Sequence, residues 1–184
     1  MDNYVGKRLD GRYEVQEIIG VGGMSVVYKA YDNFDDRTVA IKILKDEFLN
    51  NEEFKRRFKN ESKAIALLSH ENIVRVYDVN FGEKLQYIVM EYIDGIDMKR
   101  YAKLRGGRLR PEEMLALLKD VLKALNAVHK DGIIHRDISP DNIMVQPDGS
   151  VCLLDFGAAK DITFQNAASQ QIAKKGFSPP EQYR

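Results

Sequence analysis

The hydrophobic pattern of the chain changes near Gly95, and this change constrains the fold more than any other feature. Before Gly95, short alternating or apolar runs predict strands over residues 12–19, 25–31, 38–44, 73–79 and 85–91. One amphipathic helix over residues 51–68 interrupts them, because Phe54, Phe58 and Ile65 recur there at helical spacing among charges. The first half of the chain therefore predicts a small antiparallel sheet with one helix.

After Gly95 the pattern predicts mainly helix. A long helix is expected from Pro111 to Lys130, since proline suits a first turn and Glu112 and Glu113 face the positive end of the helix dipole. Two short strands follow around the turn Pro147-Asp148-Gly149. We therefore expect an α+β fold of two lobes, over residues 1–94 and 95–184.

Composition excludes several classes of protein. Lys plus Arg and Asp plus Glu each number 28, and this zero net charge argues against a nucleic-acid partner. A single cysteine, Cys152, leaves a reducing compartment as the default. No apolar run approaches the roughly 20 residues of a membrane-spanning helix, and the N-terminus lacks a signal peptide's apolar stretch. We expect a cytoplasmic segment without membrane contact.

The first motif is Gly20-Val21-Gly22-Gly23-Met24-Ser25-Val26-Val27. Glycines let backbone N–H groups approach phosphates closely, although a plain hairpin turn explains the same residues. A dinucleotide site would need a helix directly after the glycines, whereas an alternating strand follows here. This favours a glycine hairpin folded over a ligand.

A lysine, Lys42, interrupts the apolar strand at Val39-Ala40-Ile41-Lys42. An edge-strand charge with its head in water is the ordinary explanation. The functional alternative is a cation for phosphate oxygens, held by Glu61 on the following helix. Taken alone, Glu61 fits a solvated helix face equally well.

The sharpest motif is His135-Arg136-Asp137-Ile138-Ser139-Pro140-Asp141-Asn142, which crowds polar groups between two apolar pairs. Packing alone does not explain such a segment between short strands. Asp155-Phe156-Gly157 then follows a predicted strand end, where a simple turn is the alternative.

Together these residues resemble the eukaryotic-type protein kinase family, and most of all bacterial serine/threonine kinases. Lys42 and Glu61 are 19 positions apart, and Asp137 precedes Asn142 by 5 and Asp155 by 18. Pro179-Pro180-Glu181 stands where the family has Ala-Pro-Glu. The resemblance runs from Leu9 to Arg184, and it implies a five-stranded antiparallel N-lobe sheet with one helix, followed by a partial, mainly helical C-lobe.

The resemblance also implies ATP and Mg²⁺ as cofactors, with Mn²⁺ as an alternative, and a protein serine or threonine hydroxyl as substrate. Lys42, held by Glu61, would contact the α/β-phosphates. Asp137 would accept or orient the substrate proton, and Asn142 and Asp155 would bind the metal. The residues that would cover ATP are Gly20, Val21, Gly22, Gly23, Met24, Ser25 and Val27.

For the nucleoside, the resemblance implies a set of apolar and backbone contacts. Adenine would lie between Val27 and Ala40 on one side and Met144 on the other. Its edge would bond the backbone of Glu91 and Ile93. The two remaining roles belong to Met90 at the back pocket and Asp97 at the ribose.

Two departures concern the glycine loop and the catalytic loop. Ser25 replaces the third glycine, which is a mild change. Ser139 replaces a lysine that in the family offsets charge on the transferred phosphate. Lys174, which in the family fold would face the base, is a candidate to supply the missing cation. A solvated Lys174-Lys175 pair is the alternative.

The chain ends three residues after Glu181, where the family continues with further helices. We therefore expect a truncated catalytic domain with part of the apolar stripe on the 111–130 helix exposed, and a membrane anchor of the parent would lie beyond residue 184. The expected function is an ATP-dependent protein serine/threonine kinase, present as a truncated catalytic domain whose activity by itself stays an open question at this point. The alternatives are a non-catalytic nucleotide-binding scaffold and, less favoured, a small-molecule phosphotransferase.

Overall fold

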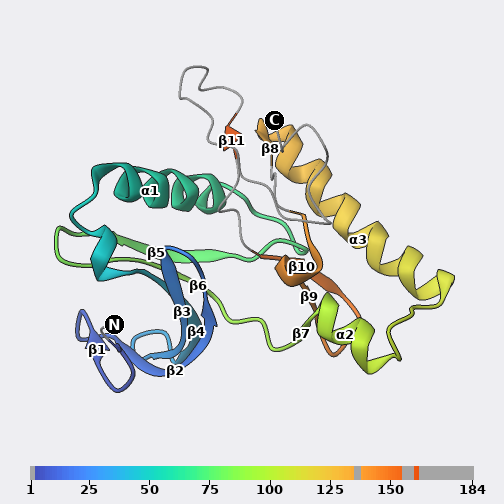
Figure 1. Ribbon diagram of the computed structural model, residues 1–184, viewed down its shortest axis with the longest axis horizontal. Coiled ribbons are helices and arrows are strands. Elements are labelled where there is room, and N and C mark those ends of the chain that lie inside the picture. Colours follow the sequence, from blue (N-terminus) through green and yellow to red (C-terminus); the bar gives the residue numbers. More distant parts are fainter. Residues whose placement is uncertain (1–2, 135–137, 155–159, 162–184) are drawn as a thin grey trace. The chain divides into compact units, whose positions relative to one another are not determined.

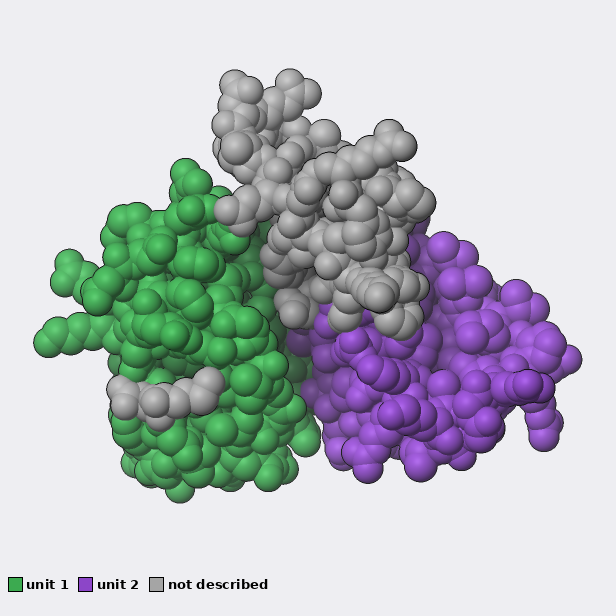
Figure 2. All heavy atoms as spheres, in the orientation of Figure 1, with its two compact units in different colours: residues 1–66, 75–92 green, residues 67–74, 93–184 purple. Residues whose placement is uncertain are grey.

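The alternation of short apolar runs and helices gives an α+β fold, seen in a computed structural model that describes residues 3–134, 138–154 and 160–161 (Figure 1). The chain divides into two units (Figure 2), the first made of residues 1–66 and 75–92 and the second of residues 67–74 and 93–184. The assignment of lobes to residues 1–94 and 95–184 stays a prediction.

The first unit is built on an antiparallel sheet with the strand order β1-β2-β3-β4-β6-β5. It contains the five expected strands and one more, β1, whose two residues are too few to show a period. The strands are β1 (Arg8–Leu9), β2 (Tyr13–Val21), β3 (Ser25–Asp32), β4 (Arg37–Leu44), β5 (Val76–Phe81) and β6 (Gln86–Glu91).

The two faces of this sheet bury different side chains, because successive residues of a strand point to opposite faces. One face carries a buried cluster that includes Tyr28, Ile41 and Val89. On the other face, Leu44 and Ile88 pack against Phe58 of helix α1 (Glu52–Ala66). The short helix η1 (Asp46–Phe48) connects β4 to α1.

Helix α1 begins where Asn51 caps it. The Asn51 Oδ1 atom accepts hydrogen bonds from the backbone N–H groups of Glu53, at 3.0 Å, and Phe54, at 3.3 Å. Such a side-chain cap satisfies donors that have no partner inside the helix. The cap therefore fixes the start of the helix that carries Glu61.

The second unit contains the long helix α3 (Pro111–Lys130), with the predicted bounds. Its buried side, Leu117, Val121, Ala124 and Val128, follows helical spacing. The remaining elements are β7 (Ile96–Asp97), α2 (Met98–Leu104), β8 (Ile133–Ile134), η2 (Pro140–Asn142), β9 (Ile143–Val145), β10 (Val151–Leu153) and β11 (Lys160–Asp161). Helix α2 was not expected from the sequence.

Part of the apolar stripe of α3 is exposed, as expected. Of the residues in this stripe, Leu118 keeps 44 % of its surface accessible and Leu122 keeps 56 %. None of the helices that the structure describes is long and apolar enough to cross a membrane.

Residues 67–74 belong to the second unit although they lie between α1 and β5 in the sequence. Leu153 N–H donates to the Asn72 carbonyl at 2.8 Å, and Val74 N–H donates to the Leu153 carbonyl at 3.1 Å. The Asn72 side chain also donates to the Val151 carbonyl at 2.8 Å. These bonds to β10 explain why β5 begins at Val76 and not at the predicted Ile73.

Candidate functional site

The glycine segment forms a hairpin between β2 and β3, as the alternating strand after it predicted. Gly20 pairs with Val27, and the N–H of Gly22 donates to the Ser25 carbonyl at 2.8 Å. A Cβ atom on Gly22 would lie 3.3 Å from that carbonyl oxygen, so glycine lets the two backbones approach at the turn.

Lys45, which sequence reasoning did not single out, ties this hairpin to the end of β4. Its Nζ donates to the Gly23 carbonyl at 2.9 Å, and its backbone N–H donates to the Met24 carbonyl at 2.9 Å. A lysine directly after a strand carries no distinguishing pattern, so no signal in the sequence could have identified it.

Lys42 lies in a central strand, where its cross-strand partners are Val27 on β3 and Ile88 on β6. Ala40, two residues before it, pairs with Met90. Because directly opposed residues share a face, the predicted nucleotide residues Val27, Ala40, Lys42 and Met90 line one face of the sheet. This is the face against which α1 packs.

Lys42 and Glu61 form a buried ion pair. The Lys42 Nζ lies 2.5 Å from the Glu61 Oε1, and the two residues are only 8 % and 6 % exposed. An isolated charge in such surroundings would be very costly, so each charge makes the burial of the other tolerable. The ordinary explanations of these residues, an edge-strand lysine and a solvated helix glutamate, do not hold.

Glu91 is the last residue of β6, and its backbone N–H forms a hydrogen bond within the first unit. That N–H donates to the Arg75 carbonyl at 2.8 Å, and the Arg75 N–H donates to the Glu91 carboxylate at 3.4 Å. The backbone N–H of Glu91 is therefore already engaged.

The second unit holds four further predicted residues, Ile93, Asp97, Asn142 and Met144. Asp97 and Met144 are cross-strand partners in the β7–β9 pair. Asp97 also caps α2, since its Oδ1 accepts the Arg100 N–H at 2.8 Å. The resemblance implied only that Asp97 bonds the ribose. The structure shows that its carboxylate also caps a helix.

Asn142 is buried, at 8 % exposure, at the end of η2. Its backbone N–H donates to the Ser139 carbonyl at 3.0 Å, and its carbonyl accepts the Leu154 N–H at 2.8 Å. Two backbone bonds therefore hold the position of the predicted metal ligand. Ser139 itself is 2 % exposed.

Gly95 has a steric role that the sequence did not reveal. In the sequence it only marked the place where the hydrophobic pattern changes. A Cβ atom there would lie 2.4 Å from the Val145 carbonyl oxygen, which is a clash with backbone. Glycine is thus needed where the chain enters β7 beside β9.

Three predicted residues lie outside the described part of the chain: Asp137, Asp155 and Lys174. Their roles stay predictions. The described residues contain no cluster of three or more His, Cys, Asp or Glu side chains able to hold a metal ion.

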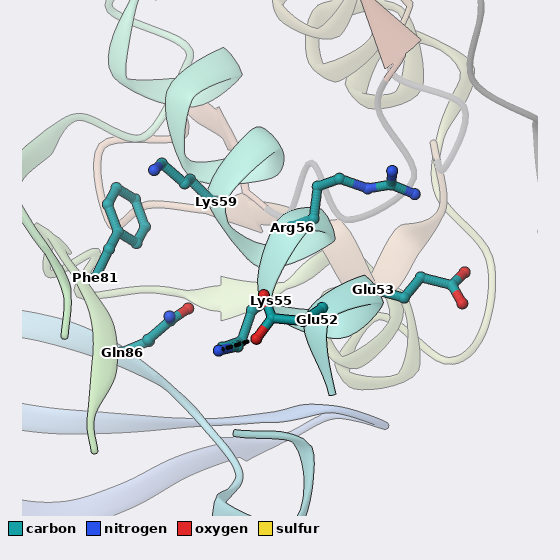
Figure 3. Close-up of a pocket in the computed structure, with 7 residues that line it drawn as sticks. All are labelled: Glu52, Glu53, Lys55, Arg56, Lys59, Phe81 and Gln86. Carbon is teal, nitrogen blue, oxygen red and sulfur yellow. Dashed lines mark ion pairs between the residues drawn. The ribbon is translucent and has the colours of Figure 1, made fainter. Parts of the chain in front are cut away.

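A separate cavity of about 570 Å³ lies in the first unit beside the N-terminal half of α1 (Figure 3). Lys55 and Glu52 form an ion pair of 2.5 Å at its wall. The cavity is lined by Glu52, Glu53, Lys55, Arg56, Lys59, Phe81 and Gln86. None of the predicted nucleotide residues is among them.

Comparison with known proteins agrees with the motifs. A family model described as "Protein kinase domain" matches residues 13–183. The chain is 47 % identical over 180 residues to a probable serine/threonine-protein kinase of Clostridium perfringens, covering 96 % of this chain and 26 % of the relative. It is 39 % identical over 182 residues to the serine/threonine-protein kinase PrkC of Bacillus subtilis, covering 98 % and 28 %.

A solved structure with a similar fold supports the same family. The structure of PpkA-294 in its apo form matches with a TM-score of 0.72 at 30 % sequence identity, covering 83 % of this chain and 60 % of that one. The chain spans about a quarter of the length of the two curated relatives named above.

Proposed function

The chain belongs to the protein kinase domain family, and from this premise we propose that it transfers the γ-phosphate of ATP to a serine or threonine hydroxyl of a protein. Phosphoryl transfer of this kind depends mainly on positioning and on neutralising phosphate charge. Side chains that bind phosphate must therefore be fixed before the nucleotide arrives.

The observation that carries the proposal is the buried pair of Lys42 and Glu61, 2.5 Å apart. An ammonium group has three N–H donors, so one that bonds a carboxylate can also donate to phosphate oxygens. The pair holds the Lys42 charge at a fixed place on the sheet face that carries Val27 and Ala40. A lysine serving only as a surface charge needs neither burial nor a buried partner.

For the nucleoside, we propose that Val27, Ala40 and Met144 contact adenine and that Met90 limits the back pocket. The Glu91 carbonyl would accept a hydrogen bond from the base, because its N–H already donates to Arg75. The Ile93 backbone would make the second bond to the base, and the Asp97 carboxylate would bond the ribose. The hairpin from Gly20 to Val27 would cover the phosphates.

Metal binding is assigned to Asn142 and Asp155. A carboxamide and a carboxylate supply the oxygen donors that Mg²⁺ and Mn²⁺ accept, so the donor set fits. The bound metal would neutralise charge on the phosphates during transfer. Asn142 contributes a position fixed by its backbone bonds to Ser139 and Leu154.

The remaining roles fall to the C-terminal part of the chain. Asp137 would accept or orient the proton of the substrate hydroxyl. Lys174 would replace the cation that Ser139 cannot supply. Alanine at Lys174 should then lower the transfer rate, and an unchanged rate would reject this assignment.

Transfer of label from γ-labelled ATP to a generic protein substrate tests the proposal. Lys42→Met should reduce the rate by about a hundredfold, as expected when a charge aimed at the transition state is lost. Lys63→Met is the matched control, because Lys63 is exposed on the same helix as Glu61. Equal rates in the two variants would contradict the role of Lys42.

Non-catalytic nucleotide binding is the second candidate function, and Ser139 in the catalytic loop favours it. Calorimetric titration with ATP and Mg²⁺ separates the two. Binding that Lys42→Met weakens, without label transfer from the parent chain, would identify a nucleotide-binding scaffold.

A further inference from the structure

A basic segment follows the Asp97 cap of α2. From residue 98 to residue 110 the sequence contains no Asp or Glu, although acidic and basic residues balance over the whole chain. We define the basic segment by its six cationic residues, Lys99, Arg100, Lys103, Arg105, Arg108 and Arg110.

The backbone of the basic segment has a defined course. After α2 the N–H of Gly107 donates to the Ala102 carbonyl at 2.9 Å, and the N–H of Gly106 donates to the Lys103 carbonyl at 3.1 Å. This is a Schellman ending, which requires the left-handed conformation. Gly106 and Gly107 have φ angles of +76° and +78°. The turn therefore holds the cations on both sides of it in fixed relation.

Most of these cations form no ion pair with the residues that the structure describes. Lys99 lies 3.8 Å from Asp141, and Arg105 lies 2.5 Å from Glu113. The other four, Arg100, Lys103, Arg108 and Arg110, are exposed and form no ion pair with any residue that the structure describes. These four cations follow one another within residues 100–110, so an anionic partner would gain by binding there.

One large apolar side chain lies among these charges. Leu104, the last residue of α2, is 69 % exposed. Its neighbours in the sequence are Lys103 and Arg105, and Arg100 precedes it by one helical turn. The partner should therefore combine carboxylates with an apolar side chain that covers Leu104.

We propose that the basic segment docks an acidic peptide segment of the protein substrate, one that contains an apolar residue and lies apart from the phosphorylated hydroxyl. The proposal rests on the kinase function proposed above. It favours a narrow partner because Asp97 and the exposed Glu112 lie directly beside the cations. A flat anionic membrane or a long nucleic acid would extend past the basic segment toward these carboxylates, whereas a short peptide need not.

Fluorescence anisotropy of a labelled peptide of glutamates around one leucine tests the docking without requiring catalysis. The variant Arg100→Gln/Lys103→Gln/Arg108→Gln should weaken the Kd by about tenfold, as expected for three exposed ion pairs. The control variant is Lys63→Gln/Lys119→Gln/Lys130→Gln. It removes three exposed cations that lie outside the basic segment and form no ion pair with a described residue, so it should leave the Kd unchanged. Thermal melting checks that both variants fold.

Further binding measurements distinguish an acidic peptide from the other anionic partners. Binding should weaken with added salt and vanish when the glutamates are replaced by glutamines. Equal loss in both triple variants would overturn the proposal. The proposal would also be overturned if the chain bound phosphatidylglycerol vesicles or single-stranded DNA more tightly than the acidic peptide, and if the variant Arg100→Gln/Lys103→Gln/Arg108→Gln abolished that binding.

Phosphorylation then distinguishes this proposal from the kinase function itself. A substrate peptide carrying the acidic segment should show a lower KM than one without it, at similar kcat. Identical KM values would reject the docking role, whereas absence of transfer to either peptide would reject the kinase function and leave the binding result to stand by itself.

Discussion

Lys42 and Glu61 place two opposite charges in the interior of the first unit. Each alone would be an ordinary surface residue, and the sequence could only suggest that they meet. Because desolvation costs a buried ion pair about as much as the attraction gains, the pair is poor evidence for stability. Its value lies in fixing one cation on the sheet face.

Removing only one partner should be far more costly than removing both. We expect Glu61→Leu to lower the free energy of unfolding by about 3 kcal/mol, because the Lys42 ammonium would stay buried without its carboxylate. The double variant Lys42→Met/Glu61→Leu should recover most of this loss. Urea denaturation with unchanged m values measures both. A double variant no more stable than Glu61→Leu would contradict the argument.

Gly95 gives a second, purely steric prediction. Gly95→Ala places a Cβ atom 2.4 Å from the Val145 carbonyl oxygen, so the free energy of unfolding should fall by about 1–3 kcal/mol. Gly23→Ala is the control, because a Cβ atom there meets nothing within 4 Å. Similar losses in both variants would show that the close approach at Gly95 is unimportant.

Among the elements, the turn between β3 and β4 is held by a carboxylate at the end of β3. Asp32 is fully buried, and Arg12 on the approach to β2 donates to both of its oxygens, at 2.7 and 2.8 Å. The backbone N–H groups of Phe34 and Asp35 donate to Asp32 as well. The hydrogen bonds from Arg12, with smaller help from these N–H groups, lower the pKa of Asp32 to about 2 against the opposing effect of burial.

This pKa shift predicts a loss of stability in acid. The folded pKa of Asp32, about 2, lies below the ordinary value of 3.8, so its contribution is present above pH 3.8 and is lost as the pH falls through 2. Urea midpoints of the parent and Asp32→Asn, measured from pH 6 downwards, should therefore converge over this acid range. A constant difference between them would exclude Asp32 as the titrating group.

For the molecule as a whole, the proposed nucleotide residues come from both units. A ligand that binds only the folded chain stabilises it by about 2.7 kcal/mol at a hundred times its Kd. ATP with Mg²⁺ should therefore raise the melting temperature, and removing the metal with EDTA should reduce the shift. Asn142→Ala should reduce it too, whereas Lys63→Met should not. A shift that persists fully with EDTA would contradict the metal assignment.

Local patterns predicted most of the architecture. The wide apolar stripe and first-turn proline predicted helix α3, and the apolar run around Lys42 predicted β4. Helix α2 was missed because it is only seven residues long, three of them basic, and lacks such a stripe. The start of β5 was misplaced because residues 72–74 bond to β10, a long-range pairing that no local pattern reveals. The burial of Lys42 and Glu61 likewise depends on how α1 packs on the sheet.

The segment 67–74 has a consequence for synthesis on the ribosome. The first unit has all its residues once Tyr92 has emerged. Asn72, however, must wait for Val151, its hydrogen-bond partner 79 residues later. Until then the apolar side chains of Leu68, Ile73 and Val74, buried in the finished fold, remain exposed on the nascent chain. We therefore expect this segment to complete its packing only after β10 has been synthesised.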